Sequence, residues 1–247
     1  MMSELEYILP GETITEINHD LRLIQKPDGL TFGTDALLLA AFVRPKRGAR
    51  AVDFGSGTGV ISLLCGLRKG FSKIYALEIQ PEYADLIGRN AALNGLSPVI
   101  EPVCGDVREF RQEADVIFSN PPYMKVGSGL ASRDDGRDMA RRERNGDIGD
   151  FCRSAASCLK FGGAFYVVYR PDRLVDLLCA MRENRIEPKR MVLVADDSRH
   201  APGIVLVEGR RGGAPSLILP RTLLLRKEDG SPSEEMAHIL SCGEWYE

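Results

Sequence analysis

The sequence has no apolar run long enough to cross a membrane. A spanning helix needs about 20 consecutive apolar residues, and charged or polar residues interrupt every apolar stretch of this chain well before that length. The first residues, Met-Met-Ser-Glu-Leu-Glu, also lack the basic start of a secretory signal peptide. We therefore expect a cytoplasmic protein that does not bind a membrane.

Metal-ligand spacings are also missing. The six cysteines are scattered and form no C-x-x-C pair, and the three histidines, His19, His200 and His238, are far apart in the chain. Buried thiols in a reducing compartment explain such cysteines better than disulfides or zinc. We expect no metal site.

The chain has no excess of positive charge. Its 32 Lys and Arg stand against 35 Asp and Glu, a net charge of −3, so the whole protein has no electrostatic attraction to nucleic acid. Residues 133–144 nevertheless hold five arginines and four carboxylates: Arg133, Arg137, Arg141, Arg142 and Arg144, with acids at 134, 135, 138 and 143. Such a loop can bind RNA phosphates, or it can be a solvated loop whose charges neutralise one another. The composition leaves both interpretations open.

Strand-like and helix-like segments alternate along the chain. Strands are predicted at about 50–54, 73–78, 98–103, 115–119, 164–169, 189–195 and 203–209. Helices are predicted at about 58–69, 82–93, 147–160, 171–184 and 232–241. Residues 12–32 are predicted to form an N-terminal hairpin followed by a helix from Thr34, 124–146 a substrate loop or lid, and 212–219 a β-hairpin extension.

This alternation predicts an α/β protein with a Rossmann-like, seven-stranded, mostly parallel sheet. We expect one domain, 1–247, made of an N-terminal hairpin and helix (1–45), a Rossmann-like core (46–210) and a C-terminal extension (211–247). Right-handed crossovers place the ligand crevice at the carboxyl ends of the strands.

A glycine-rich turn follows the first core strand, where Asp53-Phe54-Gly55-Ser56-Gly57-Thr58-Gly59 leads into a helix. Glycines at such a turn let the backbone approach a ligand closely. A dinucleotide fingerprint would need its third glycine at position 60, which is Val. The carboxylate of Asp53 would repel a pyrophosphate but attract an ammonium group, so the pattern favours S-adenosylmethionine over a dinucleotide.

Acids end the next two strands. Glu78 lies 25 residues after Asp53, close to the separation of roughly 20 at which doubly wound folds place a ribose-binding acid. Asp106 follows the third strand, where a carboxylate can accept a hydrogen bond from an adenine amine. Glu78 taken alone could equally be an exposed acid at the end of a strand.

The fourth strand ends in Asn120-Pro121-Pro122-Tyr123. Two prolines fix the backbone and remove two N–H donors, which leaves the Asn120 carboxamide oxygen and the Pro121 carbonyl as acceptors for both hydrogens of a planar amino group. Tyr123 could stack on the ring or amide that carries this group. The tetrapeptide alone is compatible with a simple turn, but in combination with the three preceding strand ends it favours methyl transfer to an amino nitrogen.

The run from Asp53 to Tyr123 resembles a class I S-adenosylmethionine-dependent methyltransferase of the branch that methylates amino nitrogens. The flanking segments are similar to the bacterial tRNA(Val) adenine-N6 methyltransferase family, over about residues 5 to 240. They are Phe32 to Ala40, Arg137 to Arg141, Arg170 to Leu174 and Val205 to Gly209. The chain departs from the family pattern at Arg141-Arg142-Glu143, where a basic-His-Glu run is expected.

This resemblance implies S-adenosylmethionine as cofactor and an RNA, most plausibly tRNA, as substrate. The candidate catalytic residues are Asn120, Pro121, Pro122 and Tyr123. The candidate cofactor-binding residues are Thr34, Asp35, Asp53, Gly55, Gly57, Gly59, Glu78, Ile79, Asp106, Val107 and Asn120, with Thr34 and Asp35 placed at the methionine end. The candidate RNA-binding residues are Arg137, Arg141 and Arg142.

Two other functions stay open at this stage. Methylation of a protein glutamine amide uses the same tetrapeptide, and the fold could also serve as a binding module without catalysis. The intact tetrapeptide and cofactor acids speak against the second, and the arginine-rich loop speaks against the first.

Overall fold

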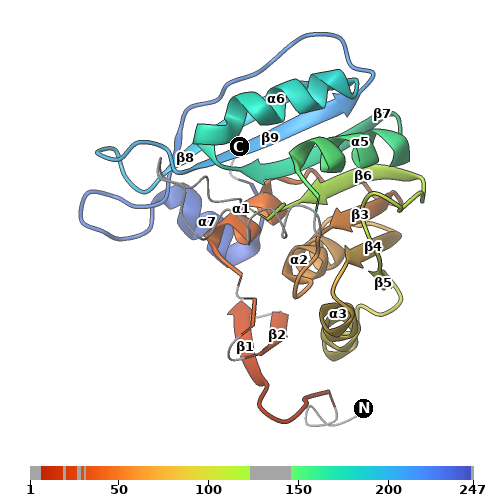
Figure 1. Cartoon of the computed structure of the whole chain (residues 1–247). Coiled ribbons are helices and arrows are strands. Elements are labelled where there is room, and N and C mark those ends of the chain that lie inside the picture. The colour runs from red at the N-terminus through yellow and green to blue at the C-terminus, as the bar shows by residue number, and fades with distance from the viewer. Residues whose placement is uncertain (1–6, 19–20, 27–28, 31, 123–145, 246–247) are drawn as a thin grey trace, which may run out of the picture.

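An eight-stranded sheet forms the centre of the molecule (Figure 1). The computed structural model describes residues 7–18, 21–26, 29–30, 32–122 and 146–245. The strand order is β10-β8-β9-β7-β6-β3-β4-β5, and β9 runs antiparallel to both of its neighbours while the other neighbouring pairs are parallel. The strands are β3 Arg50–Phe54, β4 Lys73–Glu78, β5 Ile100–Cys104, β6 Ala114–Ser119, β7 Leu159–Tyr169, β8 Ile186–Ala195, β9 Ile204–Arg211 and β10 Leu223–Leu224.

The predicted α/β fold with a mostly parallel sheet is confirmed. All seven predicted core strands are present, and the eighth, β10, is a two-residue addition at the edge. The largest shift is at β7, which begins at Leu159, five residues before its predicted start. The connection from α5 into β7 is direct, because Leu159 both caps the helix and starts the strand.

Helices cover both faces of the sheet (Figure 1). The helices α1 Thr34–Phe42, α2 Val60–Arg68, α3 Pro81–Leu93 and α7 Glu234–Cys242 lie on one face, and α5 Ile148–Cys158 and α6 Leu174–Glu183 on the other. A short 3₁₀ turn, Pro171–Arg173, opens the segment that was predicted as a single helix from 171. Within the described residues no helix has the length and apolar character needed to span a bilayer.

Strand residues alternate between the two hydrophobic layers, as the pleat of a sheet requires. In β6, Val116 and Phe118 pack into the layer that contains α1 and α2, whereas Ile117 packs into the layer that contains α5 and α6. All three side chains are buried. The sheet is therefore covered on both sides, which is the usual arrangement for parallel strands.

The predicted N-terminal hairpin is formed by β1 Thr13–Asn18 and β2 Leu21–Gln25, which pair with each other apart from the main sheet. Asn90 of α3 and Asn94, which caps the end of α3, attach it. Asn90 Oδ1 accepts the Ile24 N–H at 2.7 Å, and Asn94 Oδ1 accepts the Arg22 N–H at 2.9 Å. Both carboxamides also donate to the carbonyl of the same strand residue, so the two side chains pair with β2 as a neighbouring strand would.

The C-terminal extension differs from the prediction. Residues 212–219 do not form a hairpin with the strand before them; instead Ile218 pairs in parallel with Arg190 of β8, and β10 continues along the same edge. The reason is topological, because β9 already has β7 and β8 on its two sides. The chain that leaves β9 can find free backbone groups only at the outer edge of β8.

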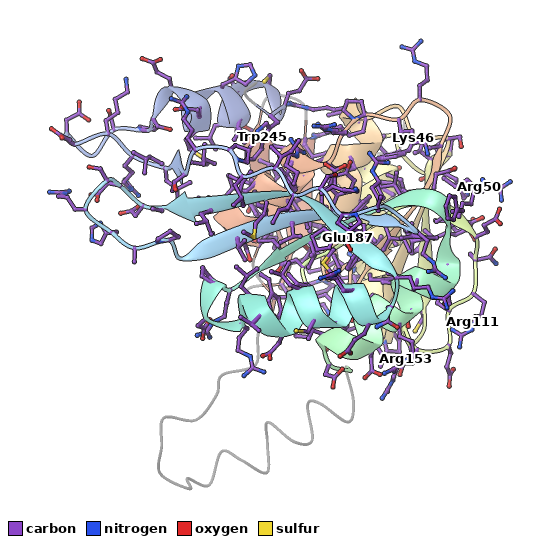
Figure 2. All side chains as sticks on the ribbon, turned by 90° about the horizontal axis from the view of Figure 1, so that it is seen from above. Lys46, Arg50, Arg111, Arg153, Glu187 and Trp245 are labelled. Carbon is purple, nitrogen blue, oxygen red and sulfur yellow. The ribbon has the colours of Figure 1, made fainter. Side chains whose placement is uncertain are left out.

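The two ends of the parallel strands carry different side chains. Lys46, Arg50 and Arg111 gather on one side of the molecule, at the end of the sheet where β3 and β6 begin (Figure 2). Lys46 Nζ lies 3.6 Å from Asp115 Oδ1, and the Arg50 N–H donates to the same carboxylate at 3.0 Å. The opposite end of the sheet, where the parallel strands finish, carries the predicted site residues.

Candidate active site

A cavity opens at the carboxyl ends of β3, β4, β5 and β6. Its empty volume, including open space at the mouth, is about 720 Å³. Thirteen residues line it: Leu30, Gly55, Gly57, Leu77, Glu78, Ile79, Gln80, Gly105, Asp106, Val107, Asn120, Pro122 and Phe151. The cavity therefore brings together the four motifs that the sequence placed at separate strand ends.

The glycine-rich turn forms one wall of the cavity. Gly55 and Gly57 have φ angles of 70° and 57°, a left-handed conformation that glycine adopts without strain. The N–H groups of Gly55 and Ser56 both donate to the Leu77 carbonyl at 2.9 Å, which fixes the turn against β4. Gly59 does not line the cavity. It caps α2, and a Cβ there would lie 3.2 Å from Ile87 of α3, so its role in this structure is close helix packing.

Glu78 is held from both sides. Its Oε2 accepts the Gly57 N–H at 2.9 Å, and its Oε1 accepts the Gln80 N–H at 3.0 Å. The side chain is 5% exposed and lines the cavity. Gln80 Nε2 also donates to Oε1, at 3.4 Å, whereas Oε2 can accept a second hydrogen bond. The group is therefore fixed in place, and its Oε2 can still bind a ligand hydroxyl.

Asp53 lies behind the turn rather than in the cavity wall. Its carboxylate is fully buried, and Oδ2 accepts hydrogen bonds from Ser56 Oγ and Ser62 Oγ, both at 2.7 Å. Its other oxygen has no hydrogen-bond partner among the described residues. Burial raises the pKa of Asp53 to about 6 against the lowering effect of the two serines, and the nearby charge of Glu78 raises it further. The direct contact with an ammonium group that the sequence suggested stays a prediction.

Asp106, Ile79 and Val107 line the opposite wall. The Arg108 guanidinium and backbone N–H bind the Asp106 carboxylate, with Nε at 3.0 Å from both oxygens. These hydrogen bonds lower the pKa of Asp106. Ile79 and Val107 add apolar surface beside this ion pair, and an apolar wall of this kind suits a flat heterocycle.

Asn120 lines the cavity directly after β6. The strand end is anchored by Ser119, whose Oγ donates to the Phe54 carbonyl at 2.8 Å. The Asn120 Nδ2 group donates to Asp35 Oδ2 at 2.8 Å. Pro121 is buried, whereas Pro122 is exposed and lines the cavity. The predicted residues Tyr123, Arg137, Arg141 and Arg142 lie outside the described residues.

The segment before β3 contains Thr34 and Asp35, whose role at the methionine end of the cofactor stays a prediction. Thr34 and Asp35 form the first turn of α1, and neither lines the cavity. Asp35 instead contacts Asn120, while Leu30, four residues before Thr34, forms part of the cavity wall. The Leu30 N–H donates to the Tyr83 hydroxyl at 2.7 Å, which holds this segment against α3.

Several cavity residues were not found from the sequence. Leu30 and Phe151 are apolar residues without a local motif, and Phe151 comes from α5, beyond the 124–146 loop. A Cβ on Gly55 would lie 3.8 Å from the Phe151 ring, so the aromatic side chain packs directly against the glycine-rich turn. Gln80 could have been found, since it immediately follows the motif acid Glu78 and its neighbour Ile79.

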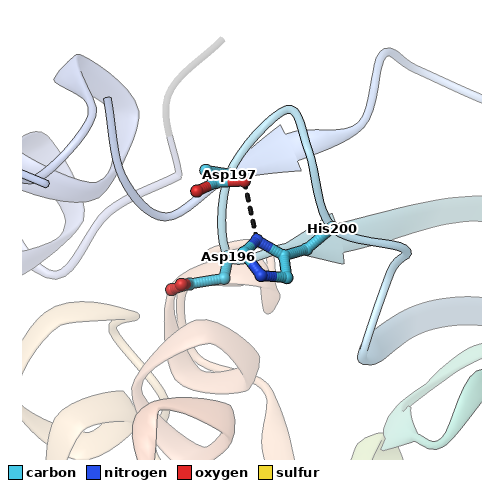
Figure 3. Close-up of side chains that lie close together, drawn as sticks. All are labelled: Asp196, Asp197 and His200. Atoms are coloured by element: carbon cyan, nitrogen blue, oxygen red, sulfur yellow. Dashed lines mark hydrogen bonds and ion pairs between the residues drawn. The ribbon is translucent and has the colours of Figure 1, made fainter. Parts of the chain in front are cut away.

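One group of side chains outside the cavity is close enough to hold a metal ion. Asp196, Asp197 and His200 lie together in the β8–β9 connection (Figure 3). Asp197 already accepts hydrogen bonds from the Arg199 side chain and from His200 Nδ1 at 2.7 Å, and Asp196 pairs with Arg226 at 3.2 Å. With these hydrogen bonds and this ion pair, the three side chains form a network that holds the β8–β9 connection in place. The expectation of a metal-free protein stays a prediction.

The fold and the cavity define a class I S-adenosylmethionine-dependent methyltransferase. The family model "Methyltransferase small domain" matches residues 27–175. A protein from Agrobacterium tumefaciens described as a predicted O-methyltransferase has the same fold, with a TM-score of 0.68 and 20% identity over 86% of this chain and 98% of its own.

The chain belongs to the methyltransferase small domain family and, within it, to the tRNA(Val) adenine-N6 methyltransferases. A Bacteroides fragilis relative named tRNA1(Val) (adenine(37)-N6)-methyltransferase is 31% identical over 66% of this chain and 69% of its own length. A Yersinia enterocolitica relative of the same name is 28% identical over 85% of this chain and 84% of its own. S-adenosylmethionine is the cofactor of this enzyme, and the anchored acid Glu78 and the apolar wall with Asp106 fit its adenosine part.

Proposed function

We propose that this protein methylates the N6 amino group of an adenine in tRNA. The observation that carries the proposal is the place of Asn120, which lines the cofactor cavity with its NH₂ group already bound to Asp35. Its oxygen is then the atom available to a substrate. The names of the curated relatives support adenine in tRNA as the substrate class.

Glu78 would bind the ribose hydroxyls of the cofactor, and Asp106 would accept from its adenine amine, between Ile79 and Val107. Asp53 would act from behind the turn, where its negative charge attracts the cationic methionine end. The bound cofactor supplies a methyl group on a positively charged sulfur. The backbone of Gly55 and Gly57 allows it to approach the sheet edge closely.

The target amine of adenine is barely basic, because its lone pair is delocalised into the ring. Asn120 Oδ1 and the Pro121 carbonyl would accept its two hydrogens and stabilise the positive charge that develops on nitrogen in the transition state. The methyl group that the cofactor would supply would bond to this nitrogen as its bond to sulfur breaks, with the electron pair of that bond left on sulfur. The proton released from the nitrogen would pass to solvent water. Orientation of the two reactants supplies much of the rate acceleration.

Tyr123 would stack on the target base, which must leave its own stack to reach the cavity. Arg137, Arg141 and Arg142 would bind phosphates of the RNA. These roles rest on the tetrapeptide and on the arginine-rich composition of the loop.

Methylation of a protein glutamine amide is the competing function, because the same two acceptors fit a carboxamide. Incubating the protein with labelled S-adenosylmethionine and separate pools of unmodified RNA and protein distinguishes the two. We expect label in the tRNA fraction and N6-methyladenosine after nucleoside digestion. Label in a protein glutamine, with none in RNA, would contradict the proposal.

A further inference from the structure

Asp35 and Asn120 meet although 85 residues separate them. Asp35 belongs to the first turn of α1, and Asn120 follows β6. Asn120 Nδ2 donates to Asp35 Oδ2 at 2.8 Å, while Asp35 Oδ1 accepts the N–H of Ala36 at 2.9 Å. The second bond fixes the aspartate rotamer against its own helix, so the carboxylate is a rigid partner for Asn120.

This contact decides which way the Asn120 carboxamide faces. A carboxamide carries a donor NH₂ and an acceptor oxygen at nearly equal positions, and its orientation depends on its hydrogen-bond partners. An ionised carboxylate accepts only, so it binds the NH₂ end. Rotation of the Asn120 carboxamide by 180° would place its oxygen against the carboxylate oxygen of Asp35. It would also turn the NH₂ group of Asn120 toward the substrate amine, which is itself a donor and needs an acceptor.

We propose that Asp35 is the positioning residue that orients the Asn120 carboxamide for methyl transfer. This inference rests on the proposed function, since it assigns Asn120 as the acceptor for the substrate amine. The negative charge of Asp35 also polarises the carboxamide, which makes Asn120 Oδ1 a stronger acceptor in a chain of hydrogen bonds. Asp35 takes no part in bond making, and its expected effect is on the rate of the chemical step.

Gly33 leaves the space that this arrangement needs. A Cβ at position 33 would lie 2.6 Å from Asp35 Oδ1, so any side chain there must displace the carboxylate. The backbone of Gly33, with φ −108° and ψ −179°, is open to other residues. Gly33→Ala is therefore expected to move the Asp35 carboxylate while keeping its charge and an allowed backbone.

The test compares Asp35→Ala, Asp35→Asn and Gly33→Ala with the wild-type chain. Glu234→Ala is the matched control, because Glu234 is also an acid in the first turn of a helix but is exposed and does not line the cavity. Single-turnover methylation of an unmodified tRNA transcript at saturating cofactor measures the chemical step, and calorimetry measures cofactor affinity.

We expect Asp35→Ala to lower the single-turnover rate about 10- to 100-fold, less than the roughly 100- to 1,000-fold that loss of a group contacting the transition state costs, because Asp35 acts through Asn120. Cofactor affinity should stay within about twofold of wild type. Asp35→Asn keeps one acceptor oxygen and should recover part of the rate, and Gly33→Ala should lose rate without loss of charge. A near-normal rate in Asp35→Ala would overturn the proposal. So would a loss of cofactor affinity equal to the loss of rate, which would make Asp35 a cofactor-binding residue instead.

A second measurement is independent of activity. The side-chain amide resonances of Asn120 can be assigned by their disappearance in Asn120→Ala. In Asp35→Ala they should move toward the values of a solvent-exposed asparagine, whereas unchanged resonances would overturn the contact and the proposal. If the wild-type chain methylates no RNA, the proposed substrate is wrong, and these resonances decide the role of Asp35 separately.

Discussion

The Gly57 N–H donates to Glu78 Oε2 at 2.9 Å, so the turn after β3 and the acid that ends β4 are fixed by each other. The Gln80 N–H holds the other carboxylate oxygen at 3.0 Å. Because the acid is preorganised, a ligand that binds it meets little further cost in side-chain ordering.

Replacing Glu78 by Ala should therefore weaken S-adenosylmethionine binding at least about tenfold. Charge-assisted hydrogen bonds to two hydroxyls would be lost, each worth roughly 1.5–3 kcal/mol. Calorimetry measures the change, and Glu82→Ala, an exposed acid in the first turn of α3, is the control. Unchanged affinity in Glu78→Ala would show that the ribose is bound elsewhere.

Asn120→Ala should leave cofactor affinity nearly intact and lower the single-turnover rate by about two orders of magnitude or more, because oriented acceptors act chiefly in the transition state. The measurement is methylation of tRNA at saturating cofactor. A mutant with a near-normal rate would mean that the substrate amine is bound by other groups.

Asn90→Ala should destabilise the protein by about 2–4 kcal/mol, since buried polar partners lose their hydrogen bonds. Asn90 is fully buried and joins Ile24 of the hairpin to the Thr58 carbonyl of the glycine-rich turn, to which its Nδ2 donates at 3.0 Å. Urea unfolding gives the free energy of unfolding. Asn94→Ala is the comparison, expected to cost about 1 kcal/mol, because its bonds to Arg22 are partly exposed and water can replace them. Equal losses in the two variants would contradict this explanation.

Asp53 should make the stability of the protein depend on pH. Its pKa is about 6 in the folded chain against an ordinary value of 3.8, so between these values the folded state holds a proton that the unfolded state has lost. The contribution of Asp53 to the free energy of unfolding is therefore at its most favourable below pH 3.8, and it is lost as the pH rises through about 6. The whole shift corresponds to about 3 kcal/mol. Unfolding curves of the wild type and Asp53→Asn should differ by a pH-dependent amount in this window, and parallel curves would contradict the prediction.

Arg137→Ala combined with Arg141→Ala should weaken RNA binding and flatten its salt dependence. Each lost phosphate contact reduces the slope of log affinity against log salt concentration by roughly 0.7 to 0.9. Cofactor affinity should stay unchanged in the same double variant. If RNA affinity and the salt slope do not change, the loop is a solvated segment without an RNA-binding role.

The sequence alone determined the succession of strands and helices along the chain and the place of the motifs at the strand ends. Apolar strand segments and helical periodicity are local patterns, and right-handed crossovers carry every parallel strand end to one edge. The glycine-rich turn, Glu78, Asp106 and Asn120 could therefore be assigned to one cavity before any contact between them was known.

The tertiary structure decided the contacts between distant segments. Neither Asp35 nor Asn90 has a neighbour in the chain that reveals its partner, because the partners lie 85 and 66 residues away. The course of residues 212–219 depended on which strand edge was still free, which is a property of the whole sheet. The burial of Asp53 likewise follows from the layers packed around it, so only the folded chain sets its pKa.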